Sequence, residues 1–119
     1  MIGKHFGRTI HVPGALTANL DIRISVPVDC RLHRVSAVAS NASSATVDVG
    51  LSDDTDEILA ARDAGDSGTP AVYGLADFAS TNPTGRLLQG EILVVTVDFD
   101  GAAGTAAQNL TVDLDFIAG

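Results

Sequence analysis

The fold is decided by the stretch Leu20-Asp21-Ile22-Arg23-Ile24-Ser25-Val26. Its apolar side chains occur at every second position, so a β-strand made of these residues buries one face and leaves the other in water. The same alternation recurs in residues 45–51 and in residues 110–116. Three such segments predict antiparallel strands whose apolar faces meet in a shared core.

Two further segments, residues 32–39 and residues 92–99, carry apolar side chains on both faces. Strands of this kind lie between two layers of a protein or against a neighbouring subunit. Residues 6–12 form a weaker strand. Turn-forming clusters of Gly, Pro, Asn, Asp and Ser separate the segments, at residues 13–14, 41–44, 65–70, 80–85 and 100–104. This spacing predicts an all-β sandwich or barrel.

Residues 52–64 are compatible with two structures. A short helix near residues 54–64 would have Asp54 as its N-cap, Glu57 three residues later, and Gly65 as its end. Alternatively, residues 57–61 form a strand that enters a Gly-rich hairpin. The strand is favoured because every neighbouring segment is a strand, and tertiary context overrides a weak helix propensity.

Length and composition indicate a single domain with a thin core. The chain has 119 residues, 45% of them hydrophobic, which fits one folded domain. It contains no Trp, one Tyr and four Phe, so the core is aliphatic and self-association is expected. We divide the chain into an N-terminal arm and first strand, residues 1–19, and a β-sandwich domain, residues 20–119.

The net charge of −8 repels phosphate backbones and anionic lipid head groups, so neither nucleic acid nor a membrane is expected as a partner. The longest aliphatic run, residues 92–95, is too short to span a bilayer, and the first twenty residues lack the apolar region of a signal peptide. A single cysteine, Cys30, forms no intramolecular disulfide, which suits assembly in a reducing cytoplasm.

Positive charge is concentrated near the N-terminus. The first 34 residues contain five Lys or Arg against two Asp, whereas residues 35–119 contain two Arg against thirteen carboxylates. Such asymmetry is typical of an arm that docks on an acidic partner. The alternative is that these cations pair with acidic residues of the same domain.

Three patterns suggest chemistry but lack the necessary partners. Residues 65–68, Gly-Asp-Ser-Gly, match the nucleophile region of a serine protease, yet no histidine of the chain has the expected context. Residues 53–57 are acidic but lack the Gly and Glu spacing of a calcium loop. Cys30 and His33 supply half of a zinc site. We therefore expect no enzyme activity, no catalytic residue, no cofactor and no metal site.

The order of the segments resembles the small jelly-roll decoration (cement) proteins of tailed-bacteriophage capsids. The segments that carry the resemblance are residues 24–30, 32–38, 45–49, 88–94 and 110–116. The resemblance implies a jelly-roll-like antiparallel β-sandwich of about eight strands. It also implies a non-enzymatic protein that is made in the host cytoplasm, binds the major capsid protein on the outer capsid surface of the virion as a homotrimer, and stabilises capsomer contacts.

Charge placement then suggests the residues that bind the capsid. The expected partner-binding residues are Lys4, His5, Phe6, Arg8, Arg31 and Arg34. Trimer contacts are expected on the doubly apolar strand at residues 93–97. The alternative function is a receptor- or glycan-binding β-sandwich module of a fibre or spike at the virion surface, although few aromatic residues are available to stack on sugars.

Overall fold

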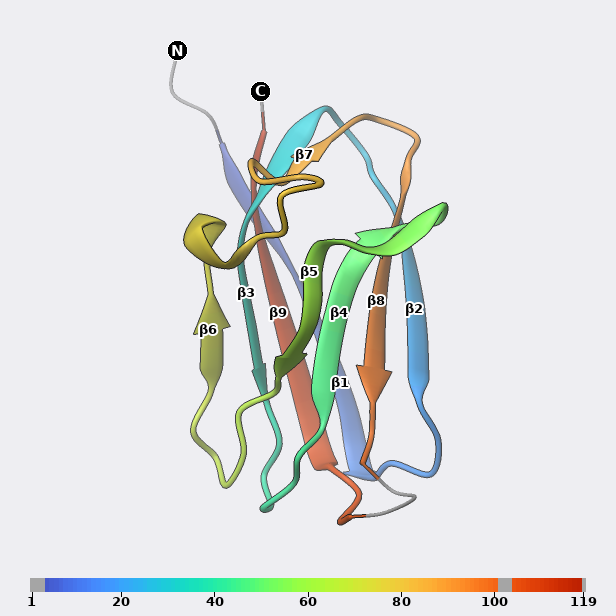
Figure 1. Cartoon of the computed structure of the whole chain (residues 1–119), viewed down its shortest axis with the longest axis vertical. Helices are drawn as coiled ribbons and strands as arrows, with labels where there is room; N and C mark the ends of the chain where they lie inside the picture. Colours follow the sequence, from blue (N-terminus) through green and yellow to red (C-terminus); the bar gives the residue numbers. More distant parts are fainter. Residues whose placement is uncertain (1–3, 101–103, 119) are drawn as a thin grey trace.

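A computed structural model describes residues 4–100 and 104–118 as a sandwich of two antiparallel β-sheets (Figure 1). The nine strands are β1 (His5–Ala15), β2 (Leu20–Ser25), β3 (Cys30–Val38), β4 (Thr46–Leu51), β5 (Asp54–Asp63), β6 (Ala71–Tyr73), β7 (Arg86–Leu87), β8 (Ile92–Asp98) and β9 (Gln108–Ala118). A single 3-10 turn, η1 (Leu75–Asp77), follows β6. The predicted all-β class is confirmed. No helix in the part of the chain that the structure describes is long and apolar enough to cross a membrane.

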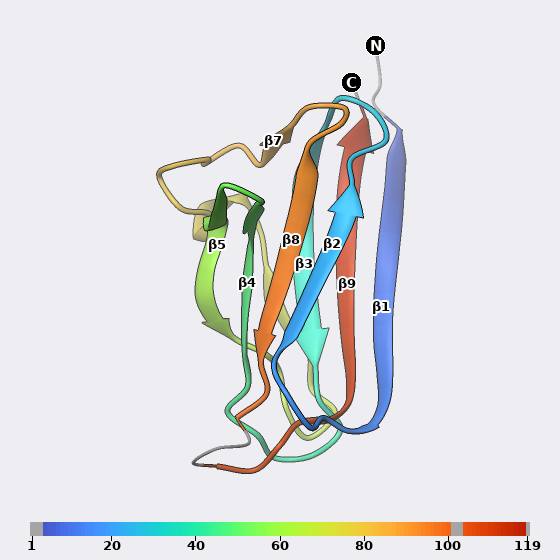
Figure 2. The same ribbon diagram turned by 90° about the vertical axis from the view of Figure 1, so that its right-hand side faces the viewer.

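The two sheets pack face to face, and in Figure 2 the strands β8 and β2 of one sheet lie in front of β3 of the other. One sheet has the order β1-β9-β3-β6, with β7 also paired to β3, and the other has the order β2-β8-β4-β5. Most connections cross from one sheet to the other. Apart from the two-residue β7, the remaining eight strands follow the order of a jelly roll. The predicted jelly-roll-like sandwich of about eight strands is therefore confirmed.

The core consists of the alternating apolar side chains of both sheets. In β9, Leu110, Val112, Leu114 and Phe116 are at most 4% exposed, and in β8 Leu93, Val95 and Val97 are at most 1% exposed. In β2, at the edge of its sheet, Leu20, Ile22 and Ile24 are only half-buried. The period-two prediction therefore identifies the inward face correctly, while position within the sheet sets the depth of burial.

The doubly apolar strand β8 is covered on its outer face by its own chain. Val94 points away from the core yet is fully buried. The turn between β4 and β5 lies over this face (Figure 1), since a Cβ atom on Gly50, which is directly opposite Val94, would meet the backbone of Asp54 and Thr55. The second layer is thus the β4–β5 hairpin, so residues 93–97 present no apolar surface for the trimer contact expected there.

Residues 54–63 form a strand, so the helix near residues 54–64 is wrong. β5 pairs with β4, with Val49 opposite Leu59 and Thr46 opposite Asp63. Two register shifts bend β5, and Ala61 adopts a φ of 37° while its N–H donates to the carboxylate of Asp48. Pairing with β4 satisfies the backbone over a longer stretch than the predicted residues 57–61, and this outweighs the local capping signal.

The first nineteen residues contain an edge strand of the sandwich. β1 pairs with β9 from His5 opposite Ile117 to Val12 opposite Leu110, and the register shifts before Ala15. The proposed division of the chain at residue 19 stays a prediction.

Gly50 provides a test of the hairpin that covers β8. A Cβ atom at Gly50 would collide with the backbone of Asp54 and Thr55, because the hairpin folds directly over this position. We expect Gly50→Ala to lower the free energy of unfolding by roughly 1–3 kcal/mol, measured by urea denaturation. The matched control is Gly74→Ala, where a Cβ atom meets nothing within 4 Å. Equal stability of the two variants would contradict this account.

Candidate functional site

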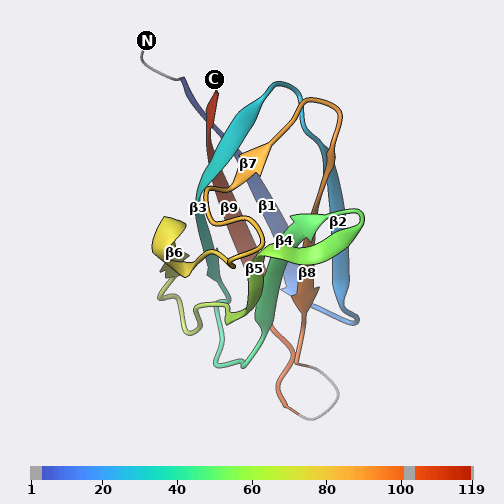
Figure 3. The same ribbon diagram turned by 45° about the horizontal axis from the view of Figure 1, so that its top comes forward.

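The clearest functional feature is a row of basic side chains on the outer face of the five-stranded sheet. It lies at the end of the sandwich where β1 begins and β9 ends (Figures 1 and 3). The register places His5 opposite Ile117, Ile117 opposite Arg31, and Arg31 opposite Arg86. Residues directly opposite in antiparallel strands share a face. Four strands therefore line up three basic side chains around one isoleucine.

The next row extends this basic surface. A register shift in β3 between Leu32 and Arg34 leaves His33 and Arg34 both exposed. The His33 ring meets the His5 ring edge-on, with centroids 5.8 Å apart. Arg34 Nε lies 3.1 Å from Asp115 Oδ2. We call this end of the sandwich the cationic end. Its basic side chains are His5, Arg31, His33, Arg34 and Arg86, together with the exposed Lys4, which directly precedes β1.

Positive charge is concentrated at this end of the molecule. The cationic end holds four of the seven Lys and Arg residues of a chain whose net charge is −8. Carboxylates also lie near these cations, and each of the following has a partner of its own. Asp115 pairs with Arg34, Asp29 accepts a hydrogen bond from Gln89 N at 2.9 Å, and Glu91 accepts one from Leu88 N at 2.6 Å. Most Lys and Arg side chains of an acidic chain are thus gathered at one end, with carboxylates among them.

Apolar side chains accompany the cations. The loops after β2 and β7 expose Val28 and Leu88 by 43% and 48%. These loops are tied together, since Val26 N donates to Glu91 O and Gly90 N donates to Val26 O, both at 2.9 Å. On the outer face beside them lies an open hollow of about 240 Å³ lined by Arg31, Leu32, His33, Leu75, Thr84 and Ile117. Such a mixture of rigid apolar tips and basic groups suits a protein interface.

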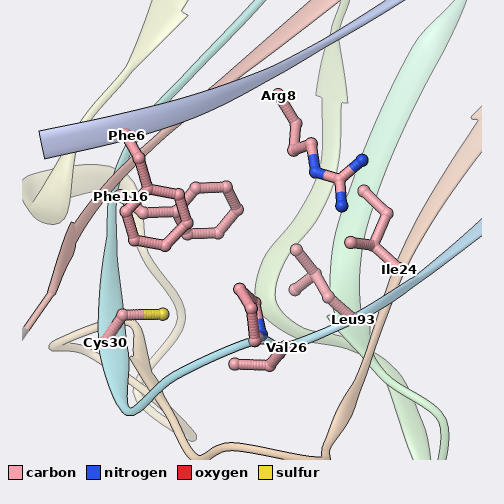
Figure 4. A pocket seen from close by; sticks show the side chains of 8 residues that line it. Phe6, Arg8, Ile24, Val26, Cys30, Leu93 and Phe116 are labelled. Carbon is pink, nitrogen blue, oxygen red and sulfur yellow. The ribbon is translucent and has the colours of Figure 1, made fainter.

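Phe6 and Arg8 lie elsewhere than the other predicted binding residues. Both point toward the opposite sheet, at the open side between β1 and β2 (Figure 4). The Phe6 ring stacks on Phe116 with centroids 4.9 Å apart, and the Arg8 guanidinium reaches toward Ile24 and Leu93. Among the described residues, Arg8 has no ion-pair partner within 4 Å. Phe6 and Arg8 are therefore not part of the outer face, to which His5 belongs.

The structure brings four of the six predicted residues to the cationic end. These residues are Lys4, His5, Arg31 and Arg34, and Lys4 is held next to the C-terminal strand by Ala118 N, which donates to Lys4 O at 2.8 Å. Sequence reasoning missed His33 and Arg86. His33 was visible beside Arg31 and Arg34, but Arg86 reaches the site only because β7 pairs with β3.

The residues of the three sequence patterns that suggested chemistry do not form a catalytic or metal site among the described residues. Cys30 points into the core and His33 points to solvent, so the two cannot share a metal ion. The carboxyl of Asp54 has a raised pKa because it shares a hydrogen bond with Asp56. In residues 4–100 and 104–118, no group of three metal-ligating side chains lies together, and no hydrogen bond joins the Ser67 hydroxyl to a histidine.

Cys30 gives a pH-dependent prediction about the core of this end. Burial raises the pKa of the Cys30 thiol above its ordinary value of 9.0. Its contribution to stability is therefore complete below that value and is lost as the pH rises toward the pKa of the folded state. We expect the free energy of unfolding to fall less steeply above pH 9.0 in Cys30→Ala than in the wild type, by up to about 1.4 kcal/mol per pH unit.

Urea denaturation at a series of pH values measures this difference. The half-buried Tyr73, whose pKa is also raised by burial, contributes equally to both curves. Parallel curves for the two proteins above pH 9.0 would show that the thiol does not behave as described.

Comparisons with known proteins place the fold but not a family. No protein-family model matches the sequence, and no curated protein matches it significantly. Among solved structures, the fold is similar to a chain of the "Cyanophage Pam1 capsid asymmetric unit", with 18% identity and a TM-score of 0.57. The similarity covers 99% of this chain and 87% of that chain. At this identity the comparison shows that the two chains share a fold.

Proposed function

We propose that this protein is a structural component of a virion, and that it decorates the outer surface of a tailed-bacteriophage capsid by binding the major capsid protein. The observation that carries the proposal is the cationic end, which presents basic and apolar side chains together. Similarity to a chain of a cyanophage capsid over nearly the whole length supports it.

The contact surface that we propose is the cationic end. Arg31 and Arg86 stand side by side on the outer face, while Val28 and Leu88 project from the loops at its tip. Basic groups steer the protein to acidic grooves of a capsid, and the rigid apolar tips contribute burial at little entropic cost. Binding at many symmetry-related positions stabilises the shell even when each contact is modest.

This function requires no chemistry by the protein. A decorating protein contributes buried contact area between capsomers, and an acidic remainder keeps its outer surface from adsorbing nucleic acid. The protein would be made in the host cytoplasm and would end on the outer face of the virion, where Cys30, buried in the core, needs no disulfide.

Receptor or glycan binding is the alternative that the aromatic residues disfavour. Sugar sites are commonly built on exposed aromatic rings. All five aromatic side chains of the chain lie in the described part, and each is buried or half-buried. Tyr73 is further engaged, since its hydroxyl donates to Asp63 O at 2.6 Å and Arg62 lies over its ring.

Binding to purified capsids tests the proposal. We expect wild-type protein to add density to the outside of empty heads in electron micrographs, and Arg31→Glu to weaken this binding by about tenfold or more, because it reverses a charge at the contact. The matched control is Arg23→Glu, an exposed arginine on the outer face of the other sheet. Absence of added density at saturating protein would reject the capsid function.

We further propose a homotrimer, held by the exposed apolar pair Val72 and Leu75 beside the edge of the five-stranded sheet. These side chains are 54% and 49% exposed. Sedimentation equilibrium is expected to give the mass of three chains for the wild type and of one chain for Val72→Asp, because a charge in an apolar contact is costly. The control is Val28→Asp, because Val28 is similarly exposed but lies at the cationic end, and this variant should remain trimeric. A monomeric wild type would contradict the trimer.

A further inference from the structure

The edge strand β1 has one unpaired side along most of its length. β1 is the terminal strand of its sheet and pairs only with β9 among the described strands, as Figures 1 and 2 show. Its register is regular from His5 to Val12. An edge of this length presents a row of free backbone groups, which is the feature that recruits an additional strand.

Hydrogen bonding identifies the free groups. Ala118 N donates to Lys4 O, and antiparallel strands alternate between hydrogen-bonded and non-hydrogen-bonded pairs. Counting from Lys4, the residues that direct their N–H and C=O away from β9 are His5, Gly7, Thr9 and His11. The residues between them, beginning with Phe6, use their backbone groups to bond β9.

The side chains facing the core at this edge are incompletely covered. Phe6, Ile10 and Val12 contact the core but remain half-buried, because no strand lies beyond β1. Arg8 stands between them and is exposed, with no ion-pair partner within 4 Å in the described part of the chain. A strand added to β1 would cover the three apolar side chains and place one of its own residues opposite Arg8.

The other sheet edges are less suited to strand addition. β6 has three residues, and β5 contains two register shifts. β2 has six residues and carries the Asp21–Arg23 ion pair. Short, bent and charged edges are the usual protection against strand addition. On β1 the corresponding device is the single inward-pointing charge of Arg8, which rejects strands that cannot pair with it.

We propose that the free edge of β1 binds an extended segment of another protein as an additional antiparallel strand, with apolar residues opposite Phe6, Ile10 and Val12 and a carboxylate opposite Arg8. Charge selects this occupant over a second copy of the chain. The ionisable side chains of β1 are His5, Arg8 and His11, without a carboxylate, so two β1 strands would place like charges together. The proposal rests on the proposed function only in taking the capsid protein as the source of the segment.

Synthetic peptides test this site directly. The probe is the capped peptide VTVTETVT, whose valines and glutamate alternate as the edge requires, and the control is VTVTKTVT. We expect the first peptide to slow amide hydrogen exchange at Gly7, Thr9 and His11, measured by NMR, and the second to have no effect. Arg8→Glu should weaken binding of VTVTETVT by about tenfold or more, as expected for loss of a charged hydrogen-bonded pair, and should permit binding of VTVTKTVT.

Two results would overturn the inference. Equal affinity of the wild type for both peptides would remove the role of Arg8, and an unchanged exchange rate at the three amides would remove the strand site. Thermal unfolding of Arg8→Glu provides the folding control, because Arg8 is exposed and its loss should leave the sandwich intact.

The capsid binding assay separates this inference from the proposed function. If heads bind the wild type and Arg8→Glu equally well, the edge is not used and capsid binding stands. If heads bind neither protein while VTVTETVT binds β1, the strand site stands and the capsid function fails.

Discussion

Burial of two facing rows of aliphatic side chains is the interaction on which this structure depends. β9 and β8 lie inside their sheets, and the side chains that they direct inward are almost fully buried. Neither sheet could remain in water with that face exposed, since each is stabilised only when the other covers it. The β4–β5 hairpin adds to this burial by covering Val94 on the outer side of β8.

The strand order of the jelly roll also determines where the basic side chains gather. A jelly roll returns the chain to both sheets repeatedly, so segments that are distant in sequence become neighbours. β1, β3 and β7 bring basic residues from three parts of the chain to one end. A rigid β-scaffold keeps these groups in fixed positions, and this makes a surface of isolated basic side chains useful for recognition.

The open edge of β1 lies next to the cationic end, because β1 is the last strand of its sheet and begins at that end. Its outward side chains join the basic surface through His5, whereas Arg8 and the half-buried Phe6 face the gap between the sheets. One strand therefore offers two kinds of contact, side chains on its face and backbone groups along its edge. Both favour an acidic partner, because no carboxylate lies on β1 to compete with it.

The sequence by itself determined the fold class and the inward face of the main strands, because alternation at period two is a local property of residues 20–26, 45–51 and 110–116. It also determined that positive charge belongs to the N-terminal third. Only the tertiary structure decided that residues 54–63 are a strand, that Phe6 and Arg8 turn away from His5, and that Arg86 stands beside Arg31. These outcomes depend on which strands become neighbours, and long-range pairing is set by the packing of the whole sandwich rather than by any segment alone.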